Sequence, residues 1–477
     1  MASYGVYDSL SPLDHRYRVS NPHLHEELSH YLGEAALVRY ETAVEAALLK
    51  AHARREGHLS PEDEKAIDAL TEKVTGEEVY AEEETTRHNI RALVNVIRRH
   101  LPENLAHFVH LGATSMDILD TANALRYRDA VERLLLPKVR RLIQALVAGA
   151  RRHSETPQVG RTHGRHAVPI TFGFFLAEYV QRLGTAYVKI AERKRELAGK
   201  LAGAVGAYNA MGLLVDDPLS FEAEVLGSLG IPVSRYSKQI VEPEYLLRLL
   251  LEINVAFGIL ANLADDLRHL QRSEIDEVRE YFAPSQVGSS TMPQKRNPWN
   301  CEHIKSLWKT FSPRVMSFFL DQVSEHQRDL SNSASGRFVP EFLAGFVLAV
   351  DRSASVVEKM EVRPERMLEN LRSTGEMVVS EALYVLLGSS GNPEAHEELR
   401  RITLKAEASG ARVREILTES PGVVAVLDAQ VRRRLGCSLE ELFAEPERYR
   451  GYAVEKTLGI CAEVERNILK EESPTNA

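Results

Sequence analysis

The stretch Gly288-Ser289-Ser290-Thr291-Met292-Pro293-Gln294-Lys295-Arg296-Asn297-Pro298 places a glycine and two serines ahead of a lysine and an asparagine that lie between two prolines. Glycine leaves the backbone free on one side, and proline fixes φ on the other. Pro284 is expected to end one helix and Pro298 to open the next, so the residues between them are predicted to form a loop. We expect Ser289 on this loop to be exposed and mobile.

Length and charge limit the classes of protein that are possible. The chain has 477 residues, 44% of them hydrophobic, which is enough for two or three domains with a large core. Its 59 basic and 68 acidic side chains give a formal net charge of -9. This balance argues against nucleic acid or a membrane surface as a partner, but it is compatible with a local basic pocket for a small anion.

The cysteines and the apolar segments indicate a cytoplasmic protein. Cys301, Cys437 and Cys461 form no CxxC pair and are expected to be reduced thiols. The first ten residues lack a basic segment followed by an apolar run, so no secretory signal is expected. The most apolar stretch, residues 246–263, is interrupted by charged residues and predicts a buried helix rather than a membrane span.

Apolar residues at helical spacing dominate the middle of the chain. They predict an all-α fold with a central bundle of long helices. The apolar stripes are wide for a single chain, which indicates burial of some of this surface between subunits. We predict three domains, 1–111, 112–364 and 365–477, with Pro137 kinking the first long helix. The long helices are expected at residues 121–147, 172–201, 245–275, 300–327 and 341–360.

Two segments place polar side chains where helices are expected to begin. A helix starting near Thr86 would offer free N–H groups and a positive dipole end to an anion, with Arg87 and His88 beside them. An ordinary capped helix with a surface histidine is the alternative. Thr114 and Ser115 can cap the following helix, whose N-terminus is itself an anion site.

Two further segments bear on cofactors. His163 and His166 could be a metal pair, but no third ligand with suitable spacing accompanies them, so no metal is expected. The Gly-rich segment 200–210 lacks both GxGxxG spacing and a surrounding βαβ pattern, so no dinucleotide is expected.

Arg328 and Arg337 lie nine residues apart, with Ser333 between them. In an average protein these arginines would be solvated charges, but the guanidinium fork is also the side chain best suited to phosphate. The plain interpretation as surface side chains applies equally to Arg16, Tyr17 and Gln239.

The stretch from Gly288 to Pro298 resembles the signature loop of the fumarase/aspartase superfamily, whose members cleave a C–N or C–O bond and release fumarate or a related product. The segments around Thr114 and His163 resemble the other two shared regions of that superfamily. From Ser11 onward the chain is also similar to adenylosuccinate lyases. The resemblance implies a nucleotide substrate, no cofactor, and a homotetramer in which three subunits contribute to each active site.

The resemblance also assigns residue roles in a β-elimination that releases fumarate from adenylosuccinate or from the succinyl-carboxamide ribotide of purine synthesis. Ser289 is the expected base, and His163 is the expected proton donor to the leaving nitrogen. Lys295 stabilises the carboxylate charge that develops, and His88 completes the catalytic set. The residues expected to bind substrate are Arg16, Tyr17, Arg87, Thr114, Ser115, Gln239, Asn297, Arg328, Ser333 and Arg337.

Two alternatives stay open. One is another C–N lyase of the superfamily that acts on an argininosuccinate-type or smaller aspartate-derived substrate. Asn89 favours it, because adenylosuccinate lyases usually carry His-Asp there, and so does the Met-Pro-Gln-Lys form of the loop. The other is a non-catalytic structural member of the fold, which the retention of Ser289, His163 and Lys295 argues against.

Overall fold

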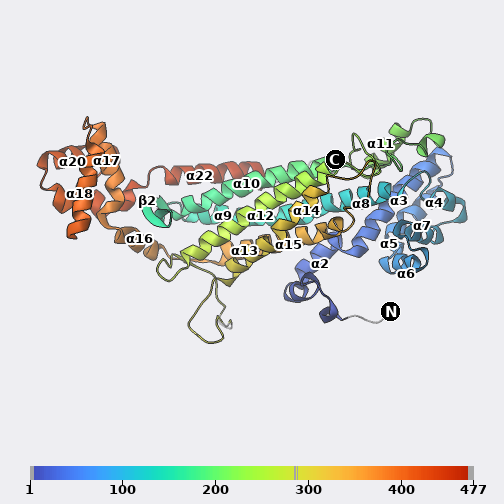
Figure 1. Ribbon diagram of the computed structural model, residues 1–477, viewed down its shortest axis with the longest axis horizontal. Coiled ribbons are helices and arrows are strands. Elements are labelled where there is room, and N and C mark those ends of the chain that lie inside the picture. The colour runs from blue at the N-terminus through green and yellow to red at the C-terminus, as the bar shows by residue number, and fades with distance from the viewer. Residues whose placement is uncertain (1–4, 284–285, 287, 471–477) are drawn as a thin grey trace. The chain divides into compact units, whose positions relative to one another are not determined.

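The computed structural model describes residues 5–283, 286 and 288–470. The chain forms two compact units, both built mainly from helices (Figure 1). Unit 1 comprises Met1–Val139, Ala186–Gly258 and Ser306–Val350. Unit 2 comprises Arg140–Thr185, Ile259–Lys305 and Asp351–Ala477. The boundaries between the units fall inside several long helices, so one helix can contribute residues to both units.

Unit 1 contains the N-terminal helices, and α3 (Glu34–Arg55) packs against α8 (Ser115–Ala130) at its centre. The buried side of α3 carries residues such as Val44 and Leu48, neither of them exposed. Its other helices include α2 (Pro22–Leu32), α4 (Pro61–Asp68), α5 (Leu70–Lys73), α6 (Gly76–Thr86), α7 (Asn89–Arg99), α11 (Pro218–Ser228) and α14 (Val315–Leu320).

Aromatic rings fill the contact between the long helices within unit 1. Phe257 of α12 (Glu244–Leu270) meets Phe346 of α15 (Val339–Lys359) edge-to-face, with ring centroids 5.5 Å apart. Gly345 lets α15 approach the ring of Phe311, because a Cβ there would lie 2.3 Å from the ring. Phe311 is the last residue of α13 (Trp299–Phe311).

Unit 2 contains two short antiparallel strand pairs among its helices. Strands β1 (Pro157–Thr162) and β2 (Arg165–Thr171) form the first pair, which is a hairpin. Strands β3 (Val278–Arg279) and β4 (Glu361–Val362) form the second pair, although they are distant in sequence. The β1–β2 hairpin joins α9 (Leu136–Arg152) to α10 (Phe172–Glu196), and β1 packs against α16 (Pro364–Ser373). Gly173 allows α10 to start close to α9, since a Cβ there would lie 2.4 Å from the Ala150 carbonyl oxygen.

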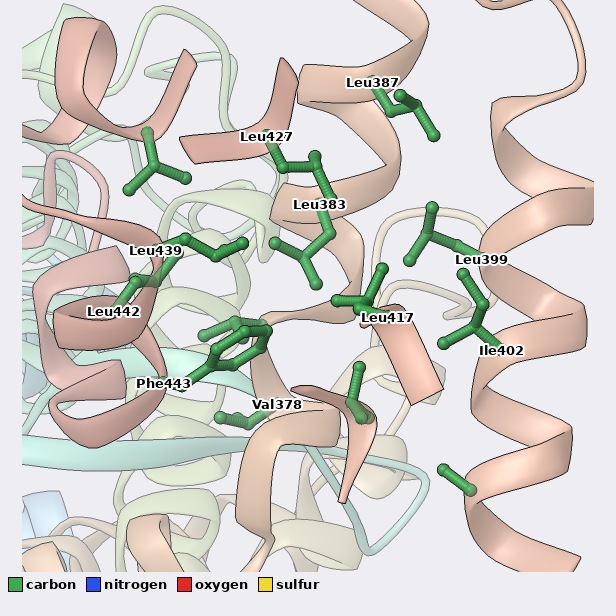
Figure 2. Close-up of a cluster of buried hydrophobic side chains, with 14 of the residues drawn as sticks. Val378, Leu383, Leu387, Leu399, Ile402, Leu417, Leu427, Leu439, Leu442 and Phe443 are labelled. Carbon is green, nitrogen blue, oxygen red and sulfur yellow. The ribbon is translucent and has the colours of Figure 1, made fainter. Parts of the chain in front are cut away.

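The C-terminal part of unit 2 has an apolar cluster of its own (Figure 2). Most of its side chains come from α17 (Ser380–Ser389), α18 (Ala395–Ser409), α19 (Val413–Leu417), α20 (Pro421–Leu435), α21 (Leu439–Ala444) and the turn before α17, and Val159 of β1 and Leu371 of α16 also belong to it. Leu383, Leu427 and Leu442 are fully buried in it, and each such side chain contributes roughly 1.5–3 kcal/mol. Helix α22 (Ala453–Val464) follows, and its Val464 contacts Gly184 of α10.

The all-α prediction is confirmed, and most of the expected long helices are present. The segment 300–327 is an exception, because α13 ends at Phe311 and a 3₁₀ turn containing Pro313 separates it from α14. A π-helical turn at Val131–Leu135 lies directly before Pro137, where a kink was expected. The three-domain division stays a prediction.

The residues before the signature loop differ from expectation. The helix expected to run up to Pro284 ends at Leu270, and strand β3 lies in between; Pro284 itself lies outside the described residues. The buried helix expected at residues 246–263 is α12. It is long and apolar enough to cross a membrane, but 56% of its most apolar window is buried, as in the core helix of a folded domain.

Candidate active site

The signature loop belongs to unit 2, and its described residues form neither helix nor strand. The amide nitrogen of the Asn297 side chain donates to the Gly288 carbonyl oxygen at 3.1 Å, joining the two arms of the loop. A Cβ at Gly288 would lie 2.3 Å from the Lys295 carbonyl oxygen, so only glycine fits there. Lys295 is exposed.

Ser289 lies inside the loop in a tight turn. Its Oγ accepts the backbone N–H of Met292 at 3.1 Å and that of Thr291 at 3.3 Å. The side chain is half-buried, so it is less exposed than expected. Two N–H donors on one hydroxyl oxygen favour a negative charge on that oxygen.

His163 occupies the turn of the β1–β2 hairpin in unit 2. Thr162 and Arg165 are paired across it, so the turn consists of His163 and Gly164, with φ of 53° and 73°. Two successive positive φ values are the geometry of the two-residue turns that suit the twist of a hairpin. The result is an exposed imidazole held at the tip of a two-stranded support.

His166 lies on the returning strand rather than at the tip. Its Nδ1 is 2.6 Å from the Thr374 hydroxyl oxygen, just beyond the end of α16. Burial and the nearby charge of Arg161 lower the pKa of His166. In the part of the chain that the structure describes, no group of three or more His, Cys, Asp or Glu side chains could hold a metal ion.

Thr114 and Ser115 lie at the start of α8 in unit 1, as expected. Thr114 is the N-cap residue, and its backbone N–H donates to the Asp117 carboxylate at 2.8 Å. That carboxylate is fully buried and also pairs with Lys200 and accepts the Gly203 N–H at 3.2 Å. A buried ion pair therefore fixes the Thr114–Ser115 segment to the Gly-rich segment after α10.

His110 is a functional candidate that the sequence did not single out. Its Nδ1 lies 2.7 Å from Oε1 of the buried Glu45, and its backbone has a φ of 64°. Burial lowers the pKa of His110, but the hydrogen bond and charge of Glu45 outweigh burial, so its pKa is raised above 6.5. The other Glu45 oxygen is buried without a hydrogen-bond partner. His110 lies four residues before Thr114, but Glu45 lies 65 residues before His110, so no local pattern predicts the pair.

The helix expected to start near Thr86 is present but starts three residues later, at Asn89. Helix α6 ends at Thr86, Arg87 takes a left-handed φ of 54°, and α7 begins at Asn89. A left-handed arginine is uncommon, so no local pattern predicts the break. His88 is the N-cap of α7, and its Nδ1 accepts the Arg91 N–H at 3.3 Å. Arg87 and His88 are both exposed.

Arg328 and Gln239 are brought together in unit 1 although they lie 89 residues apart. The Arg328 Nη1 donates to the Gln239 Oε1 at 3.1 Å, while the Arg328 Nε is buried without a partner. Ser333 and Arg337 follow in the same segment and are exposed. These contacts leave Arg328 with an unused donor, as a residue that binds an anionic ligand would have.

The candidate set is divided between the units. Arg16 and Tyr17 end a short helical turn in unit 1, the arginine exposed and the tyrosine half-buried. Unit 2 holds Ser289, His163, Lys295 and Asn297, and unit 1 holds Arg16, Tyr17, Arg87, His88, Thr114, Ser115, Gln239, Arg328, Ser333 and Arg337.

Comparison with known proteins identifies the family. Residues 15–310 match the family model described as lyase, and residues 324–436 match adenylosuccinate lyase C-terminal. The chain is 33% identical to the adenylosuccinate lyase of Pyrococcus horikoshii over 467 residues, 96% of this chain and 99% of that protein. This chain belongs to the adenylosuccinate lyases. It is also 31% identical to the adenylosuccinate lyase of Archaeoglobus fulgidus over 93% of this chain and 96% of that one.

Solved structures show that this member of the adenylosuccinate lyases has the fold of the fumarase/aspartase superfamily. A 3-carboxy-cis,cis-muconate lactonizing enzyme from Pseudomonas putida is 26% identical, with a TM-score of 0.78 over 93% of this chain and 97% of that one. A fumarate lyase from Mesorhizobium sp. BNC1 is 24% identical, with a TM-score of 0.75 over 92% and 97%, and shows the same fold. As a member of its family the chain is a C–N lyase.

Proposed function

We propose that this chain eliminates fumarate from adenylosuccinate to give AMP, and also from the succinyl-carboxamide ribotide. The observation that carries the proposal is similarity over nearly the whole chain to proteins named adenylosuccinate lyase. Arg328 also supports a nucleotide substrate, because its buried Nε has no hydrogen-bond partner and a guanidinium group binds phosphate well.

The first chemical step removes a proton from the carbon next to a carboxylate, and Ser289 is the proposed base. The N–H groups of Thr291 and Met292 that point at its Oγ would stabilise the alkoxide. Half-burial in the loop turn limits its contact with water, which keeps such a base reactive.

The second step expels the nitrogen, and His163 is the proposed proton donor. Imidazole changes protonation near neutral pH, so it suits this role better than lysine or a carboxylate would. His163 lies at the exposed tip of a hairpin, so its side chain can contact a substrate without any movement of the two strands.

Substrate contacts are assigned by charge. Lys295 and Asn297 with Thr114 and Ser115 are proposed to hold the carboxylates on which negative charge develops. The phosphate is assigned to a second group of side chains, in which guanidinium groups predominate. That group consists of Arg16, Tyr17, Arg328, Ser333 and Arg337. Gln239 and Arg87 are proposed as further substrate contacts, and His88 at the start of α7 as a further catalytic residue.

We further propose a homotetramer in the cytoplasm. Exposed apolar side chains on α14 support contact with other subunits, since Met316 is 58% exposed and Leu320 61%. The buried cysteines Cys301, Cys437 and Cys461 are all free thiols, as a reducing compartment requires.

Fumarate release from purified protein tests the function. Adenylosuccinate is supplied beside argininosuccinate and aspartate, each of which can release fumarate by elimination of its nitrogen. Release from adenylosuccinate alone supports the proposal. Turnover of argininosuccinate or aspartate alone supports the rival C–N lyase, and no turnover of any substrate supports a structural role.

A further inference from the structure

Glu277 is a fully buried carboxylate in unit 2 to which the proposed mechanism gives no role. It lies directly before β3 and accepts hydrogen bonds from three side chains. Gln158 Nε2 donates at 2.7 Å, Arg161 Nη2 at 2.6 Å and Nη1 at 3.2 Å, and Asn370 Nδ2 at 2.9 Å. A buried charge costs several kcal/mol unless it is paired and hydrogen-bonded, and here both oxygens are occupied.

Two of these donors lie on the strand that leads to His163. Gln158 and Arg161 belong to β1, and Arg161 precedes His163 by two residues. The paired Nη groups of Arg161 fix the plane of the guanidinium as well as its position, because the fork binds both carboxylate oxygens. The orientation of β1 at its end is therefore set by Glu277.

The third donor links the same carboxylate to the helix that supports the hairpin. Asn370 of α16 also donates to the Ile275 carbonyl oxygen at 2.7 Å. The returning strand is held by the contact between His166 and Thr374, just beyond the end of α16. The contacts of Arg161 and His166, which pair with each other, thus hold both strands next to the turn that carries His163.

We propose that Glu277 is a positioning residue for His163, acting through Arg161 and Gln158. The inference rests on the proposed role of His163 as proton donor. A displacement of about 1 Å at a reacting group can lower the rate roughly a hundredfold, so the contacts that hold the hairpin control catalysis without touching substrate.

The test compares Glu277→Gln with Asp276→Asn in the full-length protein. Asp276 is the neighbouring residue and pairs with Arg279 and Arg363, neither of which lies on the hairpin. Its φ of 53° is one that asparagine tolerates. We expect Glu277→Gln to lower kcat by about ten- to a hundredfold with little change in KM, and Asp276→Asn to keep kcat within about twofold.

A His163→Ala background shows whether Glu277 acts through the imidazole. If it does, adding Glu277→Gln to His163→Ala lowers the residual kcat no further. Wild-type kcat in Glu277→Gln would overturn the proposal, and so would an equal loss in Asp276→Asn or full additivity with His163→Ala. If Glu277→Gln fails to fold, Gln158→Met removes one donor at similar volume, and an unchanged kcat in that variant overturns the proposal in the same way.

Hydrogen exchange of the peptide 157–171 separates this inference from the proposed function. Faster exchange there in Glu277→Gln than in Asp276→Asn is expected whether or not adenylosuccinate is the substrate. A wild-type protein that releases no fumarate would refute the function. If the wild-type protein is active but Glu277→Gln does not change the exchange of this peptide, the positioning role is refuted.

Discussion

Replacing Lys200 with methionine removes one partner of a buried ion pair in unit 1. Neither Lys200 nor Asp117 has an exposed side chain, so the remaining carboxylate stays out of water. Removing one member of such a pair costs about 3–5 kcal/mol. Asp117 still accepts hydrogen bonds from the N–H groups of Thr114 and Gly203 in this variant. We therefore expect the free energy of unfolding to fall by about 3 kcal/mol, the lower end of that range.

The assay is thermal unfolding followed by circular dichroism. At about 2–4 °C per kcal/mol for a unit of this size, the Tm of Lys200→Met should fall by about 6–12 °C. Lys194→Met is the control, because Lys194 pairs with Glu132, whose side chain is 54% exposed, and such a pair contributes about 1 kcal/mol or less.

A double variant distinguishes the unpaired charge from lost packing. Adding Asp117→Asn to Lys200→Met removes the buried charge and leaves an oxygen that can accept the Thr114 N–H. We expect the double variant to be more stable than Lys200→Met alone. A Lys200→Met protein as stable as Lys194→Met, or a double variant that is less stable still, would refute the reasoning.

Three further predictions address the candidate site and its surroundings. Ser289→Ala should lower kcat by at least about a hundredfold, because the base is lost, and appreciable turnover would exclude Ser289 as the base. Arg328→Ala should raise KM for adenylosuccinate by about ten- to a hundredfold, as loss of a charged hydrogen bond does, but leave KM unchanged for the same substrate without its phosphate; equal effects on both substrates would contradict a phosphate contact. The raised pKa of His110 means that its pair with Glu45 stabilises the fold fully below pH 6.5 and loses this contribution as the pH rises through the raised value. The stability advantage of wild type over Glu45→Gln, measured by urea unfolding, should therefore shrink from pH 6 to pH 8, and parallel pH profiles would show that the pair has no such effect.

Local signals in the sequence predicted much of the fold. The start of α8 follows from Thr114 and Asp117, which lie three residues apart, and the start of α13 from Pro298. The break after Phe311 was not predicted, although Pro313 within the segment expected to be one helix is a local signal for it. These features depend on residues within one or two turns of each other.

The remaining features depend on residues that are distant in sequence or on uncommon backbone conformations. Arg87 ends α6 in a left-handed conformation, which no propensity for arginine predicts. The hairpin that carries His163 is held by Glu277, which lies 116 residues after Arg161. Such contacts form only when the chain is folded, so local sequence patterns suggest candidate reactive side chains but not the residues that position them.

The measurement that tests the central claim most directly is the amount of AMP and fumarate formed by the wild-type protein from adenylosuccinate. A C–N elimination at this substrate predicts that the two products appear in equal amounts and without any added metal or cofactor. Turnover of argininosuccinate or aspartate with no release of AMP from adenylosuccinate would contradict the claim.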